Sequence, residues 1–259
     1  MPSVFNSFSM RRSGLLVGFL LLVSVLWAQT PLRNVTEEEQ TWTAWFLQVK
    51  FNKHWGLWSD VHARRTGDFL DKWSQVIIRP GITYYITPQI RATAGYAYIH
   101  HFPTQGHLYV AQPEHRSWQQ IQWYANYPGL RTMQWLRLEQ RFRHNILDDY
   151  TLAEGYRYNQ RLRYNFALFV PFTKRKFEKG GLFAVLNDEI HMNPDKNTAN
   201  FFDQNRAFAG LGIQIAKHAH LQVGYMNVYQ QRGAGNAYTS NHILRVFLFQ
   251  TLDFQSPHK

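Results

Sequence analysis

Apolar and polar side chains alternate with a period of two along most of this chain. The clearest case runs from Tyr156 to Leu168, where tyrosine, leucine and phenylalanine alternate with arginine and asparagine. Successive residues of a β-strand point to opposite faces, so this spacing predicts strands rather than helices. The alternation recurs in eleven segments: 41–51, 55–65, 72–86, 89–100, 115–126, 131–142, 154–170, 181–190, 203–215, 219–230 and 240–254.

The length and connection of these segments favour a membrane barrel over a soluble sandwich. A tilted membrane-spanning strand needs about 9 to 11 residues, whereas soluble strands centre near 5 to 6, and most of these segments reach the longer class. Tight connections at 87–88, 127–129 and 216–219 alternate with longer polar ones, among them 101–116 and 143–153. Outer-membrane barrels have short periplasmic turns, longer outer loops and aromatic girdles.

The strand count raises a question of parity. Eleven segments are visible, whereas bacterial single-chain barrels have even numbers. Long loops on the outside would also make the first strand run inward from an external N-terminus. We therefore expect residues 29–40 to supply a first strand, with ten strands as the other solution. The predicted fold is all-β, an antiparallel up-and-down outer-membrane β-barrel of about 12 strands (10 to 12) over residues 41–254, followed by a tail at 255–259. The connection 171–181 is long for the periplasmic side.

The first 28 residues have the pattern of an export signal. Arg11 and Arg12 precede an apolar stretch from Leu15 to Trp27, which ends at the small residue Ala28. That stretch is too short to cross a bilayer comfortably, so a cleaved signal peptide at 1–28 is favoured over a short N-terminal anchor. The chain has no cysteine, which excludes a disulfide scaffold and a thiolate metal site. We expect the outer membrane of a Gram-negative bacterium.

Several runs resemble the domain-of-unknown-function family 2490. They are LRLEQRF at 136–142, Tyr156 to Leu168, NDEI at 187–190, FFDQNRAFAGLGIQI from Phe201, Gly224 to Arg232, and NHIL at 241–244. The resemblance covers about Trp42 to Phe254. It implies an exported β-rich protein of Gram-negative bacteria, with many relatives in the Bacteroidota. It implies no activity and carries no catalytic residues.

Strand parity predicts a charged barrel interior. If the Tyr156 row faces lipid, the alternating row faces the lumen, because an arginine in the lipid midplane would cost about 2 to 4 kcal/mol. The predicted lumen cluster is Arg137, Glu139, Arg141, Arg157, Arg161, Arg163, Glu189 and Arg206. The same rule adds Asp60, His62, Arg64, Arg79, Arg91 and Arg245. These groups would form either a salt-bridged plug, which is favoured, or an arginine ladder selecting small anions.

Signatures of enzymes and metal sites are sparse. No G-x-S-x-G, Walker loop or H-E-x-x-H motif occurs. Gly210 and Gly212 are expected to be strand residues where the wall lacks side-chain bulk. Ser117 with His115, and Ser240 with His242, could share a strand face, although chance is the better explanation. Four histidines in and around one loop could also hold a divalent metal, although solvated loop side chains are the better explanation: His100, His101, His107 and His115. Asp148, Asp149 and Asp195 follow no calcium-loop pattern.

The predicted function is therefore a non-enzymatic narrow channel or a structural envelope protein. The alternatives are a barrel hydrolase acting on membrane lipids and a soluble periplasmic barrel that binds an apolar ligand. Expected partners are outer-membrane lipids, lipopolysaccharide and small anionic solutes, with no cofactor and no catalytic residue. The net charge of +11 does not indicate nucleic-acid binding, because no arginine-rich block is present. The basic residues near Lys174 to Lys179 are expected in a solvated turn.

Overall fold

A computed structural model describes residues 33–196, 198–233 and 235–254. The predicted signal peptide at 1–28, residues 29–32 of the N-terminal segment and the predicted tail at 255–259 lie outside the described residues. Among the described residues, no helix is long and apolar enough to cross a membrane.

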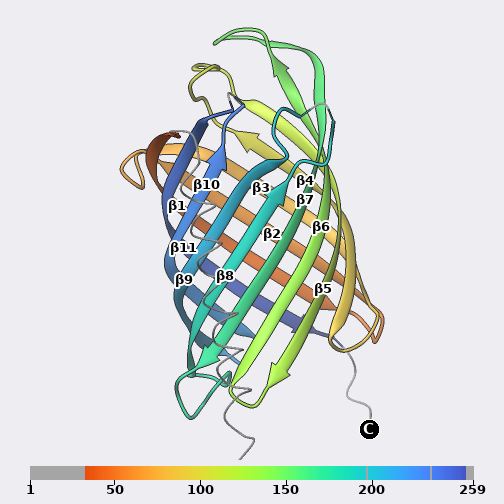
Figure 1. Cartoon of the computed structure of the whole chain (residues 1–259). Coiled ribbons are helices and arrows are strands. Elements are labelled where there is room, and N and C mark those ends of the chain that lie inside the picture. The colour runs from red at the N-terminus through yellow and green to blue at the C-terminus, as the bar shows by residue number, and fades with distance from the viewer. Residues whose placement is uncertain (1–32, 197, 234, 255–259) are drawn as a thin grey trace, which may run out of the picture. The chain divides into compact units, whose positions relative to one another are not determined.

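The described chain forms one closed β-barrel (Figure 1), which confirms the predicted fold class. The alternating rows of the sequence place one row on each side of the wall, and closure leaves no free sheet edge. Its eleven strands are β1 (Asn34–Lys50), β2 (Trp55–Thr66), β3 (Lys72–Tyr85), β4 (Ile90–His101), β5 (Gln112–Tyr127), β6 (Leu130–Ile146), β7 (Leu152–Pro171), β8 (Leu182–Met192), β9 (Phe202–Ala216), β10 (Ala219–Gln231) and β11 (Ala237–Asp253).

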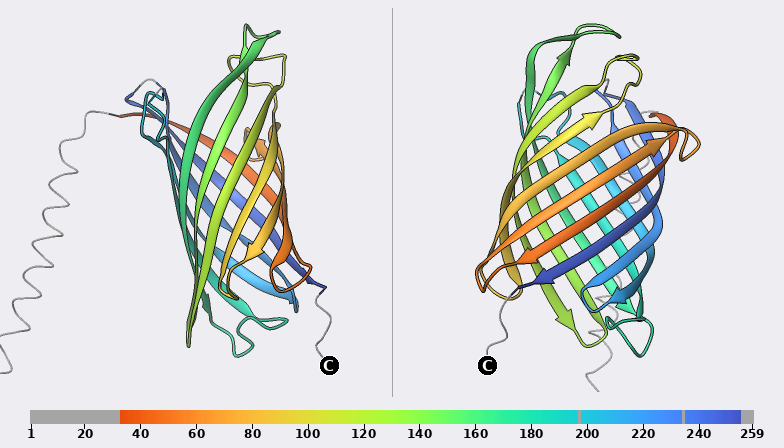
Figure 2. Two further views of the ribbon diagram at one scale, coloured as in Figure 1. Left: turned by 90° about the vertical axis from the view of Figure 1, so that its right-hand side faces the viewer. Right: turned by 180° about the vertical axis from the view of Figure 1, so that it is seen from behind.

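Consecutive strands pair antiparallel around the barrel, and β1 closes it against β11. Two contacts show that this closing pair is parallel. Thr36 Oγ1 lies 3.4 Å from the carbonyl oxygen of Tyr238 where both strands begin, and the Phe254 amide donates to the Lys50 carbonyl at 2.9 Å where both end. Figure 2 shows β1 and β11 side by side with their arrowheads at the same end.

The parallel closing pair resolves the question of parity. Eleven strands lie within the expected range of ten to twelve. Residues 34–40 extend β1 instead of forming a twelfth strand. An odd number of hairpin-connected strands must bring the first and last strands together in parallel. Asn34 and Asp253 consequently lie at opposite ends of the barrel.

The two ends of the barrel differ in their connections. The turn end has the short connections 51–54, 86–89, 128–129 and 217–218, together with the ten-residue segment 172–181. The loop end has the connections 67–71, 102–111, 147–151, 193–201 and 232–236. This alternation agrees with the sequence, including the exceptional length of 172–181. That segment hydrogen-bonds to β9, with the Gly180 amide 2.7 Å from the Gln214 carbonyl.

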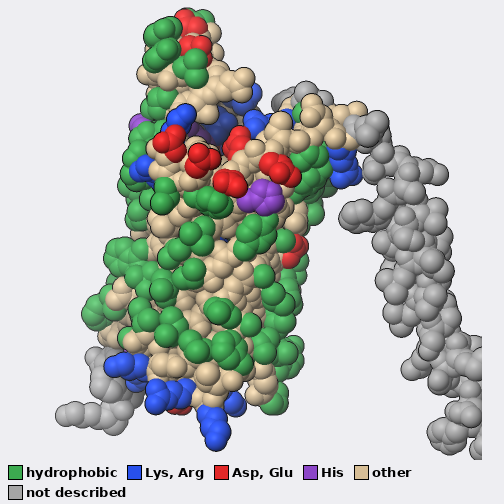
Figure 3. Space-filling view, turned by 90° about the vertical axis from the view of Figure 1, so that its left-hand side faces the viewer, with side chains coloured by type: hydrophobic (Ala, Val, Ile, Leu, Met, Phe, Trp, Pro, Cys, Tyr) green, Lys and Arg blue, Asp and Glu red, His purple; other side chains and the backbone are tan. Residues whose placement is uncertain are grey.

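The outer wall carries large apolar side chains exposed in a belt (Figure 3), with lysine and arginine side chains beneath it at the turn end. Leu211 and Ile82 are 61% and 62% exposed, although they belong to regular strands. Exposed tyrosines occur along the same wall, and midway along β10 the Tyr225 hydroxyl hydrogen-bonds to His242 Nδ1 at 2.6 Å. The wall therefore exposes an apolar belt and places a row of charged side chains inside, the reverse of a soluble barrel.

Candidate functional site

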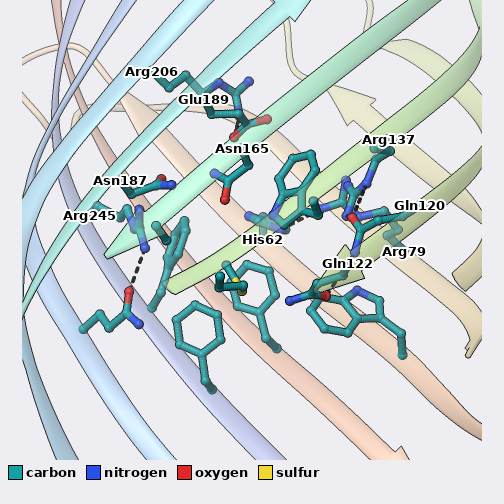
Figure 4. A pocket seen from close by; sticks show the side chains of 18 of the residues that line it. His62, Arg79, Gln120, Gln122, Arg137, Asn165, Asn187, Glu189, Arg206 and Arg245 are labelled. Carbon is teal, nitrogen blue, oxygen red and sulfur yellow. Dashed lines mark hydrogen bonds and ion pairs between the residues drawn. The ribbon is translucent and has the colours of Figure 1, made fainter. Parts of the chain in front are cut away.

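One cavity of about 780 Å³ runs through the lumen (Figure 4). Its lining includes Ser74 and Gln230 near the loop end and Gln89 and Thr251 near the turn end. The strands contribute to it through every second residue, as the alternation requires. The barrel interior is thus only partly filled.

The surface of this cavity is strongly cationic. Its lining contains twelve arginines and two lysines, against Glu189 as the single carboxylate among the described lining residues. The arginines are Arg64, Arg79, Arg91, Arg116, Arg131, Arg137, Arg141, Arg143, Arg161, Arg163, Arg206 and Arg245. Rings of arginine are one of the means by which pores select anions.

The remaining interior carboxylates lie behind the arginines, against the wall. The side chains of Asp60 and Glu114 are 0% exposed and that of Glu139 is 1% exposed. A buried carboxylate is tolerated when charged donors surround it. The guanidinium groups therefore form the layer between the acids and the cavity.

Glu139 on β6 has the largest set of cationic neighbours. Its carboxylate lies 2.6 Å from Arg163 Nη1 and 2.8 Å from Arg161 Nη2, both on β7. Three more guanidinium groups lie 3.5, 3.8 and 3.9 Å away: those of Arg116, Arg79 and Arg137. One carboxylate thus connects β3, β5, β6 and β7 inside the lumen.

Glu114 on β5 forms a second cluster nearer the loop end. It lies 2.6 Å from Arg116 Nε, 2.7 Å from Arg141 Nε and 3.2 Å from Arg143 Nε. His101 Nε2 is 2.9 Å from its other oxygen. Arg116 therefore contacts both Glu114 and Glu139 and joins the two clusters.

Three further carboxylates complete the ion pairs. Asp60 lies 2.9 Å from Arg79 Nη2 and from His62 Nε2. Glu189 lies 2.5 Å from Arg163 Nη2 and 2.6 Å from His191 Nε2. Asp203 lies 3.1 Å from Arg161 Nη1.

Three buried arginines have no carboxylate within 4.0 Å in the described part of the chain: Arg64, Arg91 and Arg245. Arg64 donates to Gln75 at 3.0 Å and stacks 3.5 Å from the Trp42 ring centroid. Arg91 donates to Gln48 and, at 2.9 Å, to Gln122. Neutral amides and aromatic faces orient these cations without neutralising them. The interior therefore keeps an excess of positive charge.

The strands β1 and β8 to β11 carry an apolar core beside polar lining residues such as Glu189 and Arg206. This core is Trp42, Phe183, Val185, Phe208, Met226, Val228, Ile243 and Phe247. Phe183 lies over Gly212 so closely that a Cβ there would overlap its ring. A second, smaller apolar cluster of Ile77, Ala97, Ile99 and Trp118 lies on β3 to β5.

The structure brings seven of the eight predicted cluster residues into the interior. Arg137, Glu139, Arg161, Arg163 and Glu189 are buried, and Arg141 and Arg206 are half-buried beside them. Arg157 is different. It is exposed and does not line the cavity, because it lies near the start of β7, where the β6–β7 hairpin extends beyond the rest of the barrel.

Sequence reasoning missed Glu114, Arg116 and Asp203. β5 begins at Gln112, three residues before the predicted start, so Glu114 fell outside the expected strand, while Arg116 lay inside it but was not assigned to the lumen. An earlier start could have been found from the row Gln112, Glu114, Arg116. Asp203 lies where the β8–β9 register shifts, and parity gives no guide there.

The suggested Ser–His and histidine–metal sites are not assembled among the described residues. Ser117 donates to Gln140 at 2.8 Å, and Ser240 accepts from Asn227 at 2.9 Å. Among the described residues no group of three histidine, aspartate or glutamate side chains could hold a metal ion. His101 instead pairs with Glu114, and His107 hydrogen-bonds to the Val110 carbonyl at 2.7 Å.

Residues 39–239 match the model of the family described as "Protein of unknown function (DUF2490)". The chain belongs to this family. An uncharacterized protein of Methylorubrum extorquens is 27% identical over 236 residues, which covers 89% of this chain and 96% of the relative. Among solved structures, a NanC porin aligns with a TM-score of 0.45 at 9% identity, covering 77% of this chain and 93% of the porin.

Proposed function

We propose that this protein is an outer-membrane β-barrel whose lumen is a narrow passage for small anions. The observation that carries the proposal is the layering of charge in the lumen. Twelve arginines and two lysines line the cavity with one glutamate, while Asp60, Glu114 and Glu139 lie behind them. Such a surface attracts anions and repels cations.

The outer wall supports the membrane placement. Contiguous exposed apolar surface is rare on soluble monomers, yet here it covers regular strands. Outward leucine, isoleucine and tyrosine beside an inward row of arginine is the arrangement that a bilayer requires. With the predicted signal peptide at 1–28, it favours the outer membrane of a Gram-negative bacterium, with its lipids and lipopolysaccharide as partners.

The ion-pair clusters act as a partial plug in the same lumen. Glu139 connects four strands through five guanidinium groups, which narrows the passage and fixes its walls. The remaining cavity still reaches both ends. A passage of this kind should carry small anions at low conductance and exclude large solutes.

Two alternatives receive less support. A lipid hydrolase would need a nucleophile beside a base, but Ser117 and Ser240 hydrogen-bond to Gln140 and Asn227. A soluble barrel that binds an apolar ligand would leave its outer belt in water.

Two adjacent arginines of β2 provide a matched test of the passage. Arg64 is buried and lines the cavity, whereas Arg65 faces the other side of the wall and donates to the Leu70 carbonyl. In planar bilayers with a potassium chloride gradient, we expect Arg64→Gln to shift the reversal potential toward the potassium value. Arg65→Gln should keep the wild-type reversal potential, because its charge lies outside the lumen.

Equal shifts in the two variants would contradict a lumenal pathway. The same preparations should be recovered in the outer-membrane fraction and show heat-modifiable migration on gels. Their recovery as soluble protein would contradict the membrane placement.

A further inference from the structure

Midway along β11, the lumen holds an arginine without a carboxylate partner among the described residues, and a group of aromatic rings lies between it and the turn end. Arg245 on β11 is 6% exposed and lines the cavity (Figure 4). No carboxylate lies within 4.0 Å of it in the described residues. A buried cation without a counter-charge is costly, so an anion from outside the chain would stabilise it.

Two aromatic rings and one amide contact the guanidinium group of Arg245. The Phe208 ring centroid lies 3.7 Å from its Cζ and the Phe247 centroid 4.3 Å. Nη2 donates to Gln222 Oε1 at 2.8 Å, and the buried Nε has no hydrogen-bond partner among the described residues. The two rings accept no hydrogen bond from the guanidinium group, so part of its hydrogen-bonding capacity remains unused. A planar fork of this kind matches a carboxylate.

A stack of three rings is formed by side chains of β1, β11 and β10. Phe46 and Phe249 are 4.5 Å apart at 8°, and Phe249 and His220 are 4.8 Å apart at 11°. Phe183 meets His220 edge-on at 5.7 Å. All four side chains line the cavity. Aromatic walls of this kind bind the apolar body of a ligand.

The segment 172–181 adds a further ring to this wall. Phe177 lies 5.4 Å from Phe183, and Arg131 lies 4.3 Å from the Phe177 ring centroid. Arg131 thus adds a second cation at the turn end. Glu189, the one carboxylate among the described lining residues, pairs with Arg163 and His191 and not with Arg245. An anionic ligand would therefore meet attraction at two places here.

We propose that this part of the lumen binds a monocarboxylate with an apolar body, about the size of 3-phenylpropionate. Arg245 binds the carboxylate, and the stack of Phe46, Phe249 and His220 packs against the body. The inference rests on the proposed anion passage and names its substrate class. A small inorganic anion would satisfy Arg245 but leave the aromatic wall uncovered.

Isothermal titration calorimetry on the detergent-solubilised protein tests the inference directly. We expect 3-phenylpropionate to bind, with 3-phenylpropanamide and propionate at least tenfold weaker. The amide removes the charge and propionate removes the ring. Binding of the amide equal to the acid would overturn the role of Arg245, and equal binding of propionate would overturn the role of the rings. No measurable binding of 3-phenylpropionate would overturn both.

Variants locate the site. Arg245→Gln should weaken binding of 3-phenylpropionate at least tenfold. Lys53→Gln removes one positive charge from an exposed turn outside the lumen and should change the affinity less than twofold. If Arg245→Gln does not fold, Phe249→Leu is measured instead. This variant should weaken the binding of 3-phenylpropionate more than the binding of propionate. Unchanged binding in the folded variant would overturn the assignment.

The same ligand separates this inference from the proposed function. Chloride conduction without 3-phenylpropionate binding would overturn the proposed binding site and support the anion passage. Binding of 3-phenylpropionate without chloride conduction would overturn the anion passage and support the binding site. If both hold, added 3-phenylpropionate should block the chloride current of the wild type more than that of Arg245→Gln.

Discussion

The two halves of the lumen differ in how much of their interior is charged and how much is apolar. On β2 to β7, Glu114 and Glu139 each have several arginines within 4.0 Å, and Asp60 pairs with Arg79. On β8 to β11 and β1, phenylalanine rings pack together, with Phe183 lying against Gly212. Ion pairs dominate the first half, whereas in the second half an apolar core lies beside the ion pairs of Glu189. The comparison shows that the barrel can hold an excess of buried arginine although the carboxylates that pair with these arginines lie mostly on one part of the wall.

The halves should therefore respond differently to mutation. In the charged half every partner matters, because removing one carboxylate leaves several guanidinium groups without compensation. In the aromatic half the cost depends on volume and overlap. Arginines that have no carboxylate partner should be the most replaceable members of the interior.

The largest effect is expected for Glu139→Gln. The variant leaves five guanidinium groups without the carboxylate that they share. Breaking a buried ion cluster costs about 3 to 5 kcal/mol. Urea unfolding in lipid vesicles, followed by tryptophan fluorescence, measures this loss. Glu178→Gln, in the exposed turn, is the control and should unfold like the wild type. A loss below about 1 kcal/mol would show that the network is not needed for stability.

An intermediate effect is expected for Gly212→Ala. The added methyl group overlaps Phe183, which is 1% exposed and packed in the aromatic half. Overpacking of this kind costs about 1 to 3 kcal/mol. Gly233→Ala, whose Cβ would meet nothing within 4 Å, is the matched control in the same unfolding assay. Equal stability of the two variants would mean that the rings can move aside.

The smallest effect on stability is expected for Arg64→Gln. Gln75 and the Trp42 ring are its neighbours, and no carboxylate lies within 4.0 Å among the described residues. Its removal lowers the repulsion among the interior guanidinium groups, so unfolding should change by less than about 1 kcal/mol. A loss as large as that of Glu139→Gln would break the distinction between compensated and excess arginines.

The sequence predicted the fold through one rule. The alternation predicted eleven strands, and at most ends their bounds agree with the structure to within a few residues. The rule works because the side chains of one row all face the outside of the barrel and those of the other row all face the lumen. It also separated the turn end from the loop end. The parallel closing pair of β1 and β11 was not predictable, because pairing of the first and last strands depends on closure and not on local sequence.

The site was less accessible to the sequence. Parity states which face a side chain occupies, but not which side chains meet across the lumen. The contact of Arg79 on β3 with Glu139 on β6 spans strands that do not pair with each other. Phe183 over Gly212 depends on the β8–β9 register, which alternation does not supply. The inward position of Phe177 comes from the fold of a turn that has no period.

The orientation of the wall is the central claim, and adjacent residues of β11 test it. The chain has no cysteine, so Leu244→Cys and Arg245→Cys each introduce a single thiol. In protein reconstituted into lipid vesicles, we expect the thiol at 245 to react with a small water-soluble methanethiosulfonate. The thiol at 244 should resist that reagent and, when labelled with a fluorophore before reconstitution, be quenched by brominated lipid. The opposite pattern, with 244 reactive and 245 protected and lipid-quenched, would contradict the account.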